Sequence, residues 1–105
     1  MANDDAPPAV EHDERAQQFR LRQDGHLALI QYARSGDRIV LVHTEVPKAI
    51  EGHGIAGTLA RTALDYARDH ALAVVASCPF VASYVRRHKE YQDLLTPAER
   101  ERILG

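Results

Sequence analysis

The sequence has one cysteine, no tryptophan and only two Phe and four Tyr among its 105 residues. The single cysteine, Cys78, excludes an internal disulfide and a cysteine-based zinc cage, and it agrees with a reducing compartment. No apolar run approaches the roughly 20 residues that span a bilayer. The first 14 residues also lack the basic-then-apolar order of a signal peptide. We therefore expect a cytoplasmic protein without a membrane partner.

Excess positive charge is also missing, since the net charge is −2 and the sequence pI is about 6.3. The first 14 residues carry five acids and neither Lys nor Arg, which leaves the remainder at a net charge of +3. Dedicated nucleic-acid-binding proteins usually have a strongly basic face, so no nucleic acid is expected as a partner. A small anionic ligand is compatible with this charge.

The composition that remains is that of one globular domain, with 45% hydrophobic and 27% charged residues. Residues 1–16 contain Pro7-Pro8 and no sustained hydrophobic period, which predicts a disordered acidic tail. Residues 17–105 are predicted to form the domain, since one domain of about 100 residues is common. We expect it to be a monomer or a weak homodimer.

Hydrophobic alternation predicts three consecutive strands after this tail. The first begins at Gln18, and Asp24-Gly25 predicts a hairpin turn before the second, His26–Ala33. A turn at Ser35–Asp37 leads into Arg38–Val46, whose central residues are apolar on both faces, as in an interior strand. The short turns predict an antiparallel meander.

The hydrophobic period becomes helical after the predicted loop Pro47–Gly54. Apolar residues then recur at helical spacing over Ile55–His70. The short apolar segment Ala73–Ser77 is typical of a buried parallel strand reached by a helical crossover. Shorter helices are predicted after Pro79 and from Pro97. The order β-β-β-α-β-α indicates an α/β domain on a mixed sheet.

The segment Glu51–Gly57 (EGHGIAG) joins the third strand to the long helix. Glycines at such a junction let the backbone approach a ligand, and the first N–H groups of a helix attract an anion. The pattern predicts a pyrophosphate-binding loop, although a tight turn would need the same glycines. Gly52, Gly54 and Gly57 also fit GxGxxG, which favours a nicotinamide or flavin site. That reading is weaker, because the strand does not run into the first glycine.

With its surroundings, this loop resembles the acyl-CoA pyrophosphate loop of the GNAT superfamily of N-acetyltransferases, usually Gln/Arg-x-x-Gly-x-Gly/Ala. Gly54 and Ala56 match that pattern, whereas Glu51 departs from its first position. Flanking segments are similar to those of the small single-domain GNAT-like acetyltransferases: Val42–Pro47, Ser77–Val81, Tyr84-Val85 and Tyr91. The resemblance covers residues 17–95.

The resemblance implies a GNAT-like fold with acetyl-CoA as cosubstrate. In GNAT-like proteins the strand before the loop pairs through its backbone with the pantetheine arm, which here implies Glu45, Val46 and Pro47. A cysteine at the end of the following strand faces the thioester, which is the position of Cys78. The remaining implied contacts are with the pyrophosphate: Gly52, His53, Gly54, Ile55, Ala56, Gly57 and Thr58.

Two mechanisms stay open for such a transfer. An amine attacks acetyl-CoA directly with Glu45 or His43 as base, or the acetyl group passes through Cys78. Tyr84 matches the region where GNAT enzymes often keep a general acid. Each residue also has a structural reading: Cys78 as a small buried hydrophobe, Glu45 and His43 as a strand-end hydrogen bond, and Tyr84 as part of the core.

Other titratable residues carry less information. Arg86 and Arg87 belong to a short basic run that is either a solvated helix face or a partner for the 3′-phosphate of CoA. His12, His26 and His70 lack ligand spacing, so we expect no metal site.

The sequence thus predicts an acetyl-CoA-dependent N-acetyltransferase with an amine acceptor. The helices that GNAT enzymes usually insert between their first two strands are missing from the pattern. An open acceptor site is therefore expected, suited to a peptide or protein amine or to a weakly bound small molecule. The alternative is a non-catalytic module that binds acyl-CoA or another protein on the same scaffold.

Overall fold

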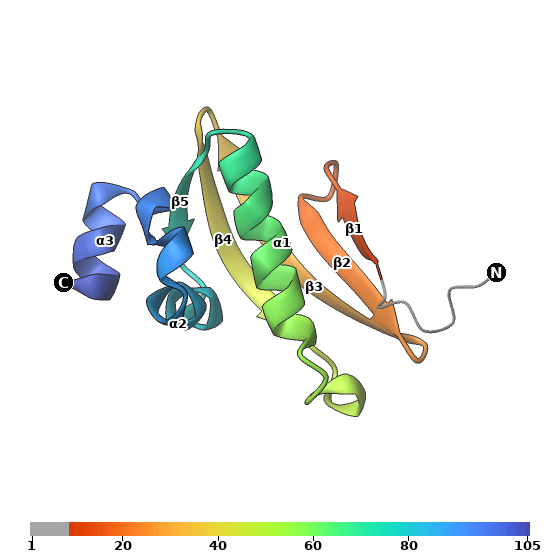
Figure 1. Ribbon diagram of the computed structural model, residues 1–105. Coiled ribbons are helices and arrows are strands. Elements are labelled where there is room, and N and C mark those ends of the chain that lie inside the picture. Colours follow the sequence, from red (N-terminus) through yellow and green to blue (C-terminus); the bar gives the residue numbers. More distant parts are fainter. Residues whose placement is uncertain (1–8) are drawn as a thin grey trace.

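The structure, a computed structural model that describes residues 9–105, is one sheet with a long helix across one face (Figure 1). In chain order its elements are β1 (Val10–Asp13), β2 (Gln18–Gln23), β3 (His26–Ser35), β4 (Arg38–Glu45), the 3-10 helix η1 (Lys48–Ile50), α1 (Ile55–Asp69), β5 (Ala73–Ala76), α2 (Pro79–Arg87), the 3-10 helix η2 (Lys89–Leu94) and α3 (Pro97–Leu104).

The sheet has the strand order β1-β2-β3-β4-β5. Strands β1 to β4 form an antiparallel meander, and β5 joins β4 in parallel after the crossover through α1. This confirms the predicted mixed α/β sheet and its parallel crossover strand. The Asp24-Gly25 turn is also confirmed, since both residues have positive φ, as a tight hairpin turn requires.

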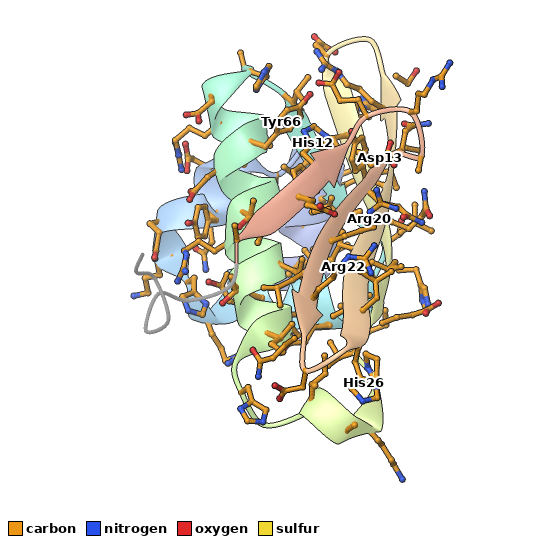
Figure 2. The ribbon with its side chains drawn as sticks, turned by 90° about the vertical axis from the view of Figure 1, so that its right-hand side faces the viewer. His12, Asp13, Arg20, Arg22, His26 and Tyr66 are labelled. Atoms are coloured by element: carbon orange, nitrogen blue, oxygen red, sulfur yellow. The ribbon has the colours of Figure 1, made fainter. Side chains whose placement is uncertain are left out.

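The prediction that residues 1–16 form a disordered tail is wrong from residue 10 onward, because β1 pairs with β2. His12 of β1 stacks on Phe19 with ring centroids 4.2 Å apart and meets the edge of Tyr66 at 4.7 Å. Its Nε2 lies 2.6 Å from the hydroxyl of Tyr32. Figure 2 shows His12 and Tyr66 between β1 and α1. These partners are distant in sequence, so a local pattern does not reveal them. Residues 1–8 of the predicted tail lie outside the described residues.

The core lies between the sheet and α1. Strands β2 to β5 and the helix all contribute fully buried side chains, among them Ile30, Ile39, Leu41, Leu59 and Leu64. No helix in the described part of the chain covers the opposite, open face of the sheet, where Arg20 and Arg22 lie (Figure 2). Among residues 9–105, no helix combines the length and hydropathy that a bilayer crossing requires.

Candidate functional site

Strands β4 and β5 part at the carboxyl end of β5 (Figure 1). Their parallel pairing runs from Arg38–Ala73 to Leu41–Ala76. One further backbone bond follows, in which Cys78 N–H donates to the carbonyl of Leu41 at 2.9 Å. β4 then continues to Glu45, whereas the segment that follows β5 turns into α2. The last residues of β4 therefore extend past β5, with no described strand beside them on that side.

A β-bulge in β4 decides which side chains point into this opening. Gln31 of β3 faces His43, but the next residue, Tyr32, faces Leu41, so Val42 is the extra residue. A bulge reverses the facing of every later residue in its strand. Thr44, paired with buried Ile30, therefore turns toward the helices.

Cys78 is buried, with only 4% of its surface exposed, directly before α2. Its Sγ lies 3.2 Å from Oγ1 of Thr44. Thr44 is not predicted from the sequence, because alternation without a bulge assigns it to the other face of β4. The thiol therefore has a polar neighbour at the point where β4 and β5 part.

His43 and Glu45 share one face of β4, as predicted, and His43 Nε2 lies 2.9 Å from Glu45 Oε2. Both side chains are more than half exposed. The bulge puts them on the open face of the sheet, opposite to Thr44. The structure therefore pairs these two residues with each other and separates them from Cys78 by the thickness of the sheet.

The glycine-rich loop presents free backbone N–H groups. Gly52 and Gly54 have φ of +88° and +73°, and Gly54 is the N-cap of α1 without any side-chain cap. The first intrahelical bond is donated by Thr58 N–H to the carbonyl of Gly54. The N–H groups of Ile55, Ala56 and Gly57 consequently have no acceptor within the helix. This helix N-terminus has the geometry that binds phosphate elsewhere.

A cavity of about 430 Å³ lies against this N-terminus. The loop and the first turn of α1 form one wall, and Phe80, Tyr84 and Arg87 of α2 form another. Val46 and Ile50 close it on the side of β4 and η1. The cavity thus joins three predicted parts of the site: the glycine loop, the residue that follows β4, and the helix after Cys78. Sequence reasoning did not single out Ile50 and missed Phe80 as a lining residue.

Tyr84 is 7% exposed, as its core reading predicted, and it also borders the cavity. Its role as a general acid stays a prediction. Its ring stacks on His88 with a centroid distance of 3.9 Å, and burial raises the pKa of its hydroxyl. A Cβ on Gly57 would lie 3.7 Å from the Tyr84 ring. A methyl group at position 57 would therefore contact the Tyr84 ring without a clash.

Of the remaining residues predicted to bind CoA, some line the cavity and others bond to groups within the protein. Arg87 lines the cavity, whereas Arg86 Nε donates to the carbonyl of Ile103 in α3 at 3.3 Å. The carbonyl of Pro47 accepts from Ile50 N–H within η1. His53 is an exposed loop residue, and the Thr58 hydroxyl donates to the carbonyl of Gly54 at 3.1 Å.

The donor set fits an anionic, elongated ligand. Free N–H groups and Arg87 offer donors to phosphate, and the apolar walls accept a linear chain. Glu51 is the exception, because it borders the cavity with a carboxylate. Within residues 9–105, no three His, Cys, Asp or Glu side chains come together as a metal site.

Known proteins have similar sequences. The family model described as GCN5-related N-acetyl-transferase matches residues 18–94. Protein NATD1 of Homo sapiens is 41% identical over 96 residues, which cover 87% of this chain and 85% of the human protein. Protein NATD1 of Danio rerio is 36% identical over 98 residues, which cover 90% of this chain and 84% of that protein.

The fold is shared as well. The solution NMR structure of a GCN5-like protein from Staphylococcus aureus matches with a TM-score of 0.69 at 26% identity, over 87% of this chain and 90% of that chain. The family model covers most of the five-stranded sheet and all of α1 and α2. The residues of its loop, its fold and these matches together show that the chain belongs to the GCN5-related N-acetyltransferase family.

Proposed function

We propose that this protein transfers the acetyl group of acetyl-CoA to an amine. One observation carries the proposal: the uncapped N-terminus of α1 and the end of β4 border the same cavity. The first offers N–H donors for a pyrophosphate, and the second offers backbone groups for an amide-containing arm. A ligand with both parts joined in a line is the acyl-CoA that members of this family use.

The site residues then take separate tasks. The N–H groups of Ile55, Ala56 and Gly57, with Arg87, would hold the pyrophosphate. Acetyl-CoA supplies the activated thioester. The backbone from Glu45 to Pro47 would align the pantetheine arm along β4. This directs the acyl end toward the point where β4 and β5 part, beside Cys78 and Thr44.

The acceptor would reach this point from the open face of the sheet. His43 and Glu45 lie there, exposed and paired, and either would take the proton of an incoming ammonium group before the amine enters the gap between β4 and β5, where the thioester is proposed to lie. All connections among β1 to β4 are short turns, so no inserted helix restricts access on this face. We therefore propose the amine of a peptide or protein as the acceptor.

Ligand-induced thermal stabilisation is the first test of this function. Acetyl-CoA and CoA at about 100 times their Kd should add roughly 2.7 kcal/mol to the free energy of unfolding. For a domain of this size, that raises the melting temperature by roughly 10 °C or more. NADH serves as the control, because it carries a pyrophosphate without the pantetheine arm. An equal response to NADH, or no response to any of the three, would contradict the proposal.

Turnover with a panel of peptide amines then separates the mechanisms. If the amine attacks directly, Cys78→Ala retains turnover, whereas His43→Gln and Glu45→Gln together lower kcat by about 100-fold. If the acetyl group passes through Cys78, intact-protein mass spectrometry detects one added acetyl group, which Cys78→Ala abolishes. Tight binding of acetyl-CoA with no turnover on any amine would instead identify a non-catalytic acyl-CoA-binding module.

A further inference from the structure

The outer edge of β5 is covered by α3 and the segment before it, and two side chains take the place of a strand there. Thr96 N–H donates to the carbonyl of Val74 at 3.2 Å. At Ala76, the last residue of β5, the partners are side chains of α3. Helix α3 lies beyond β5 on the side away from β4 (Figure 1). Ala76 N–H donates to Glu99 Oε1 at 2.8 Å, and the Ala76 carbonyl accepts from Arg102 Nη2 at 2.9 Å.

Glu99 and Arg102 also bind each other directly. Arg102 donates to both carboxylate oxygens of Glu99, at 2.7 and 2.8 Å. Glu99 is 8% exposed, and the Arg102 guanidinium keeps the pKa of its carboxyl below the ordinary value. A bidentate pair has one preferred orientation. The pair therefore presents one acceptor and one donor to Ala76 in fixed positions.

Ala76 is two residues from Cys78, which is held from the other side by its N–H bond to Leu41 in β4. The short segment from Ala76 to Cys78 is therefore fastened to β4 on one side and to α3 on the other. Its position decides where the Cys78 thiol lies relative to Thr44. A shift of the segment would move the thiol at the point where the thioester is proposed to lie.

We infer that Glu99 and Arg102 are positioning residues that fix the Ala76–Cys78 segment and, through it, the Cys78 thiol. The catalytic consequence rests on the proposed acetyl transfer, whereas the positioning itself does not. An ion pair that only stabilised the fold would affect all of the core alike. Positioning predicts instead an effect concentrated at this segment.

Amide hydrogen exchange and alkylation of Cys78 by iodoacetamide measure the positioning without turnover. In Glu99→Ala, Ala76 N–H loses its buried acceptor, so we expect exchange at Ala76 and Cys78, and alkylation of the thiol, to become about tenfold faster or more. Exchange at Ile30 and Leu64 in the core should change far less. Glu99→Gln keeps an acceptor for Ala76 N–H and should recover much of the protection.

Two further variants make the comparison specific. Glu101→Ala removes an exposed carboxylate from the same helix and should leave exchange and alkylation unchanged. Arg102→Met removes the donor to the Ala76 carbonyl from a side chain that is 54% exposed, so the domain should fold even if Glu99→Ala does not. It should speed alkylation of Cys78 as well.

Activity adds a separate readout. If the acetyl group passes through Cys78, Glu99→Ala should lower kcat while the KM for acetyl-CoA stays within about twofold, because the loop and α1 hold the rest of that ligand. A uniform rise of exchange across the whole core, or unchanged exchange and alkylation at the segment, would overturn the inference. If the wild-type protein shows no turnover, the proposed function fails, but exchange and alkylation still decide whether the pair positions Cys78.

Discussion

At the scale of single residues, Gly54 has the clearest reason for its identity. It begins α1 with φ of +73°, a left-handed conformation in which a Cβ is disfavoured. Nothing lies within 4 Å of a Cβ built on Gly54, so the penalty of substitution is one of backbone conformation and not of a clash. The residue turns the chain so that the first N–H groups of α1 face the cavity.

Gly54→Ala should lower the free energy of unfolding by about 1–2 kcal/mol, the cost of a left-handed non-glycine residue. It should also weaken acetyl-CoA binding, because relief of this strain moves the N–H groups. Gly36→Ala is the matched control: Gly36 has φ of +60° in the turn between β3 and β4, away from the loop. Urea unfolding should show a similar loss in both, while calorimetry with acetyl-CoA should show weaker binding in Gly54→Ala alone. Equal weakening in both would contradict a specific role of Gly54.

Ligand binding in the cavity should tolerate a methyl group at position 57 but not a larger side chain. A Cβ there meets the Tyr84 ring at an ordinary contact distance of 3.7 Å. Gly57→Ala should therefore stabilise the protein by up to about 1 kcal/mol through helix propensity, with acetyl-CoA binding retained. Gly57→Leu would fill the cavity and abolish binding while the domain stays folded. Differential scanning calorimetry and ligand titration of both variants test this, and tight binding by Gly57→Leu would place the ligand elsewhere.

At the scale of elements, β1 is held by its pairing with β2 and by the contacts of His12. Its ring lies among Phe19, Tyr32 and Tyr66, so β1, β2, β3 and α1 meet at one side chain. His70 also stacks on Tyr66, with ring centroids 4.0 Å apart. Burial lowers the pKa of His12 below its ordinary value of 6.5, while the nearby Glu14 opposes that shift.

This shift predicts a loss of stability in mild acid. The unfolded chain binds a proton at His12 more readily than the folded protein, so the stabilisation is complete above pH 6.5 and is lost as the pH falls through the lower, folded-state pKa. Urea unfolding between about pH 7.5 and 5 should show this loss, and His12→Phe should reduce the slope. A steeper slope in His12→Phe would contradict this assignment.

At the scale of the whole molecule, the fold is a sheet with one covered face and with its β5 edge closed by α3 and the segment before it. The long helix covers one face, and the open face remains for the acceptor in the proposed function. The edge at β5 is closed by Thr96, Glu99 and Arg102, because unpaired backbone groups on an edge strand promote aggregation.

A chain that ends at Leu95 should therefore lose far more than a small surface helix. It would expose the β5 edge, remove the partners of Ala76 and uncover buried Leu95. We expect it to aggregate or to unfold at 25 °C, which size-exclusion chromatography and circular dichroism would detect. A variant that keeps the full chain but replaces the exposed Arg100 with Ala should remain monodisperse. A stable, monodisperse truncated domain would contradict this role of α3.

Local patterns predicted most elements and the residues of the loop. Strands β2 to β5 and helix α1 follow from hydrophobic periods, and glycines and prolines mark their ends, because both signals depend on neighbours in the chain. The same signals placed Gly52–Gly57 before a helix and so predicted an anion site. The residue types at Glu45 and Cys78, with the family resemblance, supplied the candidate chemistry.

The amino-acid sequence by itself thus determined the order of the elements, the glycine loop at the start of α1 and the membership of a family. Only the tertiary structure decided that residues 10–13 form β1, that a bulge at Val42 turns Thr44 toward Cys78, and that α3 closes the β5 edge. The physical reason is shared. Each of these features depends on partners far away in the chain, and one inserted residue reverses the facing of all that follow it in a strand.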